Sequence, residues 1–130
     1  MSEGGVVVLK TPSMQRTQMM DRTKKFSLRV IHLVSKLPKN NVARVIGGQL
    51  LRSATSIGAN YREAARSSTK KHFTSILTTA LREADETLYW LELLADSQIV
   101  KPALLVDLRD ECNQLVAILA ASVKKARQPS

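Results

Sequence analysis

Apolar side chains recur at steps of three or four residues through most of the chain, a spacing typical of amphipathic helices. The clearest example lies between Leu50 and Arg66, where a single arc holds Leu50, Ala54, Ile57, Tyr61 and Ala64. The same period predicts helices at about 20–37, 42–65, 70–97 and 103–125. Because the connections are short, neighbouring helices should run antiparallel. The pattern therefore predicts an all-α fold, namely an antiparallel up-down-up-down four-helix bundle.

The ends of these helices carry recognisable signals. Pro38 should end the first helix, since the residue before a proline avoids helical backbone, and the hydroxyl side chains at 67–69 can cap the third. Gly47 and Gly48 fall inside the second helix, where a close helix–helix approach or a local bend would explain them. Residues 1–18 show no period, so we expect a flexible tail ahead of a bundle domain at 19–127.

The distribution of charge adds a candidate binding surface. The formal net charge is +9, with the basic residues concentrated before position 83 and most acidic residues between 83 and 111. This asymmetry fits a nucleic-acid footprint or charge-complementary packing between subunits, and a solvated surface is the plain alternative. Few aromatic residues and no base-reading module are present, so nucleic-acid binding would be directed at the backbone. The candidate residues are Arg44, Arg52, Arg62, Arg66, Lys70 and Lys71.

The third predicted helix carries a second candidate surface. Tyr89, Trp90 and Leu93 fall on the side away from its apolar arc, which predicts contact with another subunit. Its acidic residues could form a solvated face or could pair with the basic second helix of a neighbouring subunit. These acids are Glu83, Asp85, Glu86 and Glu92. We therefore expect a homo-oligomer with Glu86 and the three apolar residues at its interface.

Residues suited to catalysis or metal binding are scarce. The two histidines, His32 and His72, fall on different predicted helices, and the glutamates lack the histidine partners of a bundle metal site. No phosphate-cradling glycine loop occurs, so the sequence predicts no enzyme, no metal and no cofactor. Cys112 is the single cysteine, which favours a reducing compartment and a cytoplasmic location. No apolar run reaches the ~20 residues of a membrane span, so no membrane partner is expected.

Two sequence runs resemble a known family. They are QLLRSATSIGANYREAARSS at 49–68 and HFTSILTTALREADETLYWLELL at 72–94. Both look like the bacterial four-helix-bundle proteins encoded within intervening sequences of 23S rRNA genes, and like the accessory variability proteins of diversity-generating retroelements. The resemblance spans roughly 26–119, although YREAAR stands here where many relatives carry an IAEG-like segment.

The resemblance implies an antiparallel four-helix bundle that assembles into a pentameric ring with a basic central channel. The arginines that match within or just after the first run are Arg52, Arg62 and Arg66. In the retroelement branch, the resemblance also implies binding of nucleic acid and of a partner reverse transcriptase.

Two functional hypotheses follow. The first is a non-enzymatic homo-oligomer that binds the RNA or DNA backbone through its basic faces, with an affinity that falls as salt rises. The second is a protein-interaction scaffold whose basic face recruits an acidic partner protein, such as a reverse transcriptase. Nuclease treatment during a pull-down would separate the two, because it should release partners only in the first case.

Overall fold

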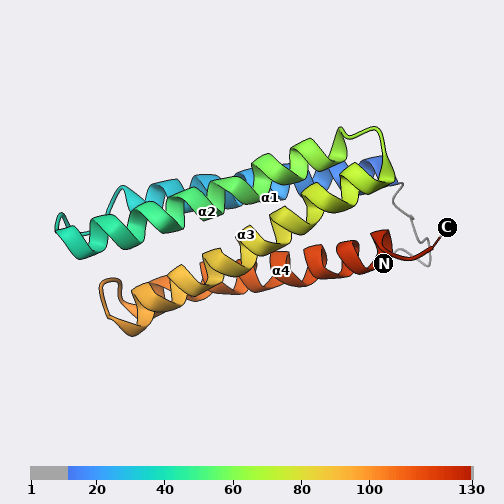
Figure 1. The fold of residues 1–130 in the computed structure, drawn as a ribbon. Helices are drawn as coiled ribbons and strands as arrows, with labels where there is room; N and C mark the ends of the chain where they lie inside the picture. Colours follow the sequence, from blue (N-terminus) through green and yellow to red (C-terminus); the bar gives the residue numbers. More distant parts are fainter. Residues whose placement is uncertain (1–11, 130) are drawn as a thin grey trace, which may run out of the picture.

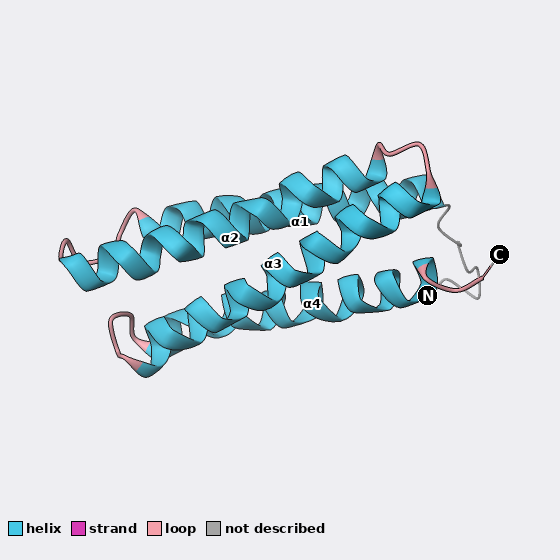
Figure 2. Cartoon of the chain, in the orientation of Figure 1, coloured by secondary structure: helices cyan, strands magenta, loops and turns pink. Residues whose placement is uncertain are grey.

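Four long helices and one short 3-10 helix form the part of the chain that the computed structural model describes, residues 12–129 (Figure 1). The elements are α1 (Pro12–Val34), α2 (Asn41–Ala65), α3 (Lys70–Asp96), the 3-10 helix η1 (Pro102–Leu105) and α4 (Val106–Ala126). No strand occurs within residues 12–129 (Figure 2). Consecutive long helices run antiparallel and pack closely, whereas α1 and α4 touch only sparsely. The predicted all-α four-helix bundle is confirmed, with one side more open than the others.

The first helix begins earlier than its sequence pattern predicted. Residues 12–18, expected in the flexible tail, form the first turns of α1, and residues 1–11 of that tail lie outside the described residues. Pro12 suits a helix start, because the backbone N–H that proline lacks would have no intrahelical acceptor at that position. Met19 is buried and anchors this turn on the core. At its other end, α1 stops at Val34 instead of continuing to Leu37.

Capping side chains define the starts of the next two helices. Asn40 Oδ1 accepts a hydrogen bond from the Ala43 N–H at 2.9 Å, and Thr69 Oγ1 accepts one from the His72 N–H at 3.1 Å. Each bond satisfies a backbone donor that a helix start leaves without an intrahelical acceptor. The predicted hydroxyl cap of the third helix is therefore confirmed, and Thr69 supplies it.

The core is built from the apolar arcs that the spacing identified. Its largest fully buried side chains come from all four helices and η1: Phe26, Val30, Leu50, Ile57, Leu77, Leu91, Leu94, Leu105, Leu115 and Leu119. Cys112 also lies in this core, four residues after Leu108 on the inward face of α4. Burial raises the pKa of the Cys112 thiol to about 12. The thiol therefore stays protonated near neutral pH and acts as a small apolar side chain.

The start of the fourth helix differs from its prediction. The helical spacing of Leu104, Leu108, Leu115 and Leu119 predicts that all four face the core. Leu104 is instead 69% exposed, whereas Leu105 beside it is fully buried. The cause is η1, because a 3-10 helix has three residues per turn and changes the angular position of every side chain relative to an α-helix. From Val106 onward the chain is α-helical, and the inward positions Leu108, Leu115 and Leu119 are buried.

Three hydroxyl side chains are buried inside the bundle, and each has a hydrogen-bond partner. Thr87 Oγ1 donates to Ser53 Oγ at 2.9 Å, which joins α3 to α2, and Ser53 Oγ lies 3.2 Å from the Leu50 carbonyl oxygen. Thr23 Oγ1 donates within α1 to the Met19 carbonyl at 2.9 Å. Because the hydroxyl groups are paired, their burial carries little penalty.

An ion pair bridges the open side of the bundle. Arg22 of α1 donates from Nε to Glu111 Oε2 at 2.7 Å and from Nη2 to Glu111 Oε1 at 2.8 Å. Its Nη2 also donates to Gln114 Oε1 at 2.7 Å. These hydrogen bonds hold the pKa of the Glu111 carboxyl below its usual range and raise the pKa of the Arg22 guanidinium. This pair is thus the main polar link between α1 and α4.

The two adjacent glycines of α2 have different surroundings. A Cβ at Gly47 would lie 2.7 Å from Leu37 Cδ1, so the close approach expected at this pair is present at Gly47. A Cβ at Gly48 would meet nothing within 4 Å.

We expect Gly48→Ala to raise the free energy of unfolding by about 0.5–1 kcal/mol, because alanine loses less backbone entropy in a helix. Urea denaturation followed by circular dichroism measures the change. Gly47→Ala is the comparison, and its gain should be smaller since Leu37 must move. A gain at Gly47 equal to that at Gly48 would contradict the packing described.

Candidate nucleic-acid interface

The six basic residues predicted to bind a ligand are spread along the bundle. Arg62 and Arg66 belong to the last turn and C-cap of α2, and Lys70 and Lys71 to the first turn of α3. All four therefore lie at the end of the molecule where α1 begins and α4 ends (Figure 1). Arg44 lies near the opposite end of α2, roughly 33 Å from Arg66 by the rise of an α-helix. The structure therefore brings four of the six together and leaves Arg44 apart.

Arg52 is held by two carboxylates of its own chain. Its Nη1 lies 3.2 Å from Glu83 Oε1, and its Nη2 pairs with Glu86 Oε2. The Trp90 indole N–H also donates to Glu86 Oε2 at 2.9 Å. The hydrogen bond from Trp90, followed by those from Arg52, lowers the pKa of the Glu86 carboxyl. Among the acids of α3, Glu83 and Glu86 thus pair with α2 of their own chain, and not with a neighbouring subunit as one of the two alternatives predicted.

The aromatic pair of α3 is only partly directed to solvent. Tyr89 is 53% exposed, as an interface residue would be, but Trp90 is half-buried and packs against the core of its own chain. Their rings meet edge to face, with centroids 5.2 Å apart. Leu93 is also half-buried. The prediction that all three face away from their own core therefore holds for Tyr89 and is wrong for Trp90.

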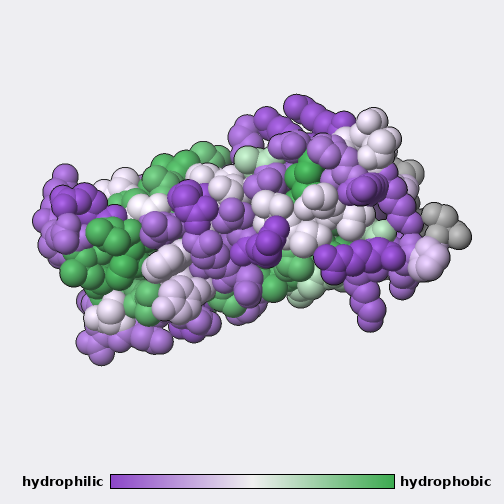
Figure 3. Space-filling model, in the orientation of Figure 1, coloured by the Kyte–Doolittle hydropathy of each residue, from purple (hydrophilic) through white to green (hydrophobic). Residues whose placement is uncertain are grey.

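A groove between the first half of α3 and the end of α4 gathers further cations. It encloses about 660 Å³ and is lined by Lys70, Lys71, Thr74, Ser75, Thr78, Arg82, Ala126 and Arg127. Among these lining residues none is acidic. Arg127 Nη2 lies 3.5 Å from Thr78 Oγ1, and Lys70 Nζ donates to the Gln128 carbonyl at 2.7 Å. This end of the molecule is mainly hydrophilic on the face shown in Figure 3.

Two of the groove cations, Arg82 and Arg127, were missed as ligand candidates. A sequence signal for Arg82 exists, because Lys71, Ser75, Thr78 and Arg82 follow helical steps of four, three and four. Arg127 could be identified only by also considering how the helices pack. In an antiparallel pair, the end of α4 lies beside the start of α3, so basic residues at these two ends should meet.

The described residues hold no metal centre and no membrane-spanning helix. Across 12–129, no three His, Cys, Asp or Glu side chains are grouped so that they could hold a metal ion. No helix within the same range is both long and apolar enough to cross a bilayer.

Comparison with known proteins identifies relatives by both sequence and structure. Residues 15–121 match the model of a family described as 23S rRNA-intervening sequence protein. A crystal structure from Bacteroides thetaiotaomicron VPI-5482, of a protein of unknown function from the S23 ribosomal protein family, superimposes with a TM-score of 0.79. It is 32% identical, and the alignment covers 85% of this chain and 99% of the other. No curated protein shows significant similarity to the chain.

Proposed function

The chain belongs to the family of 23S rRNA-intervening sequence proteins, and we propose that it binds the sugar–phosphate backbone of RNA or DNA through the groove between α3 and α4. The observation that carries the proposal is the composition of this groove. Lys70, Lys71, Arg82 and Arg127 line it together with three hydroxyl side chains, and no acidic residue is among the lining residues. Cations and hydroxyl groups are the side chains that most often contact phosphate oxygens.

The dimensions of the groove suit an extended polyanion. Lys71 and Arg82 are three turns apart on α3, a separation of roughly 16 Å along the helix axis, which is long enough to pass several phosphates. Arg62 and Arg66, at the end of α2, are exposed as well, but neither lines the groove. Glu83 and Glu86, two of the acids that follow Arg82 on α3, pair with Arg52. The positive charge of Arg52 therefore largely offsets the negative charge of these two carboxylates.

We also propose that the protein acts as a homo-oligomer, without catalysis, in the cytoplasm. Large apolar side chains exposed on the single chain support self-association, among them Leu28 at 55%, Val42 at 59% and Tyr89 at 53%. The lowered pKa values of Glu86 and Glu111 arise from ion pairs and hydrogen bonds within the bundle. They therefore need no catalytic explanation.

The experiment compares two double variants that remove the same charge from opposite ends of the bundle. Lys71→Ala with Arg127→Ala removes two groove cations, and Lys39→Ala with Arg44→Ala is the matched control. Binding of a fluorescent single-stranded RNA and of duplex DNA is measured by anisotropy at several salt concentrations. For the groove variant we expect a loss of at least about tenfold at low salt. For the single strand, the slope of log K against log salt should become less negative by about 1.4, since two phosphate contacts are lost.

The control should keep both the affinity and the salt slope of the wild type. Equal losses in the two double variants would show that only net charge matters, and salt-independent binding or no binding would contradict the proposal. Binding to acidic proteins that survives nuclease treatment would favour a protein partner instead. Sedimentation of the same samples reports the oligomeric state, and a monomer at micromolar concentration would contradict self-association.

A further inference from the structure

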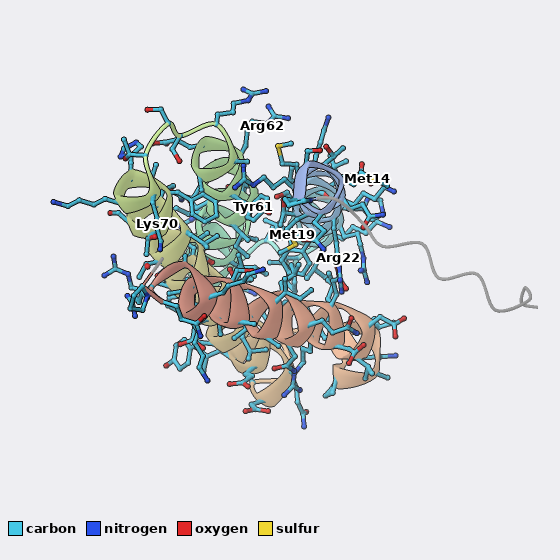
Figure 4. All side chains as sticks on the ribbon, turned by 90° about the vertical axis from the view of Figure 1, so that its right-hand side faces the viewer. Met14, Met19, Arg22, Tyr61, Arg62 and Lys70 are labelled. Carbon is cyan, nitrogen blue, oxygen red and sulfur yellow. The ribbon has the colours of Figure 1, made fainter. Side chains whose placement is uncertain are left out.

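A second and larger hollow lies at the same end of the bundle, and all four long helices contribute to it. Its volume is about 810 Å³, within the range of small-molecule sites. The first turns of α1, the α2–α3 turn and the last turns of α4 surround it. Figure 4 looks onto this end of the molecule and shows Met19, Tyr61 and Arg22 lying between the helices, while Arg62 points outward. This end cavity shares Lys70 and Ala126 with the groove described above.

The charged residues around the end cavity are all basic. Arg16, Arg22, Lys70 and Lys125 line it, and no acidic side chain is among its lining residues. Arg22 is already bound to Glu111 and Gln114, and Lys70 donates to a backbone carbonyl. Arg16 and Lys125 form no ion pair with any residue between 12 and 129, so their charge is available to a ligand. The cavity thus presents two uncompensated cations.

The rest of the lining combines ring surfaces with hydroxyl groups. Phe73 offers an aromatic face, over which the Arg16 guanidinium lies 5.1 Å from the ring centroid. Burial raises the pKa of Tyr61, so its hydroxyl group remains a hydrogen-bond donor. The α2–α3 turn and α4 add the hydroxyl residues Ser67, Ser68, Thr69 and Ser122. Ser67 and Ser122 donate to the Ala64 and Ile118 carbonyl oxygens, so their own oxygens can still accept a hydrogen bond from a ligand. Thr69 Oγ1 accepts from the His72 N–H and keeps its own proton to donate. A ring system with polar edges can use these positions.

We propose that the end cavity binds a nucleoside monophosphate, either as a free nucleotide or as the 5′-terminal nucleotide of a strand. Arg16, whose guanidinium lies over one face of Phe73, and Lys125 hold the phosphate. The base lies against the Tyr61 ring and the part of the Phe73 ring that Arg16 does not cover, with the nearby hydroxyl groups at its polar edges. A volume of about 810 Å³ accommodates a ligand of this size. The contribution of four helices makes the site depend on the assembled bundle.

Calorimetric titration of the full chain tests the proposal with AMP and adenosine as probes. We expect AMP to bind and adenosine to bind at least about tenfold more weakly, because only AMP offers a charged phosphate to the two cations. Arg16→Ala with Lys125→Ala should weaken AMP binding by about tenfold or more. Lys39→Ala with Arg44→Ala, which removes the same charge from the distant end, should leave AMP binding unchanged. Circular dichroism confirms that each variant is folded.

A second experiment distinguishes a free nucleotide from the end of a strand. It also separates binding at the end cavity from binding in the groove. A 5′-phosphorylated oligonucleotide that binds more tightly than its 5′-hydroxyl counterpart, with the difference lost in the Arg16/Lys125 variant, identifies a strand end. AMP binding without that difference identifies a free nucleotide. Equal binding of AMP and adenosine, no AMP binding, or an unaltered Arg16/Lys125 variant would each overturn the proposal. None of these results depends on whether the Lys71/Arg127 variant loses affinity for the 5′-hydroxyl strand.

Discussion

Replacing Leu91 by alanine should lower the free energy of unfolding by about 3–5 kcal/mol, the range for a fully buried leucine. Leu91 has no solvent exposure, and α3, to which it belongs, packs against α2, α4 and η1. The substitution removes apolar contacts and leaves a cavity that the surrounding helices can close only in part. Urea denaturation monitored by circular dichroism gives the change directly. A loss of this size would leave a small domain close to its unfolding threshold.

The matched control lies two residues away on the same helix. Tyr89 is 53% exposed, and its ring contacts Trp90 edge to face. We expect Tyr89→Ala to cost less than about 1 kcal/mol, most of it from the lost ring contact. Comparable losses at Leu91 and Tyr89 would contradict the orientation of α3. If Tyr89 contributes to self-association, its variant should instead shift the oligomeric state at nearly unchanged folding stability.

The second large effect should follow from Glu111→Gln, which breaks the link between α1 and α4. The Arg22 guanidinium would keep its position but lose a bidentate carboxylate partner. Hydrogen bonds between charged groups are among the stronger ones. Because both side chains retain some solvent contact, we expect a loss of about 1–2 kcal/mol at neutral pH. Glu63→Gln, at an exposed acid with no ion pair within residues 12–129, should change little.

The pH dependence of this loss has a defined direction. The folded-state pKa of Glu111 lies below its unfolded value, mainly because Arg22 donates hydrogen bonds to the carboxylate. Its contribution to stability is therefore fully present above the unfolded value of about 4.3. It disappears as the pH falls through the lower folded-state pKa. The difference between wild type and Glu111→Gln should shrink below about pH 4, and a difference that stays constant to lower pH would contradict this assignment.

The apolar arcs were enough to predict the helices and most of the core. Leu50, Ile57 and Leu91 could be placed inward from spacing alone, because a continuous α-helix fixes the angle of every side chain. The same spacing wrongly placed Leu104 in the core, because η1 interrupts the α-helical period just before α4. The early start of α1 was missed because residues 12–18 are mainly polar and carry no periodic signal of their own. These residues are helical because they continue the turns of α1 that pack on the core.

The candidate site was harder to predict because it depends on which residues of different helices face each other. Arg52 appeared available on its own helix, and only the packing of α2 against α3 shows that Glu83 and Glu86 occupy it. Arg82 and Arg127 lie far apart in sequence, and the antiparallel pairing of α3 with α4 brings them to one groove. Charge composition identifies a basic protein, but the positions of its unpaired charges require the tertiary structure.

The open side between α1 and α4 has a consequence for how the bundle can come apart. Apart from the Arg22–Glu111 bridge, α1 is attached chiefly along α2, while α3 is held on both sides. Partial unfolding should therefore begin with α1 swinging away from α4, at a free energy below that of complete unfolding. Residues at the start of α1 would leave the end cavity in that motion, and the remaining three helices would keep their contacts. The opening between α1 and α4 is thus the expected starting point of local unfolding in this bundle.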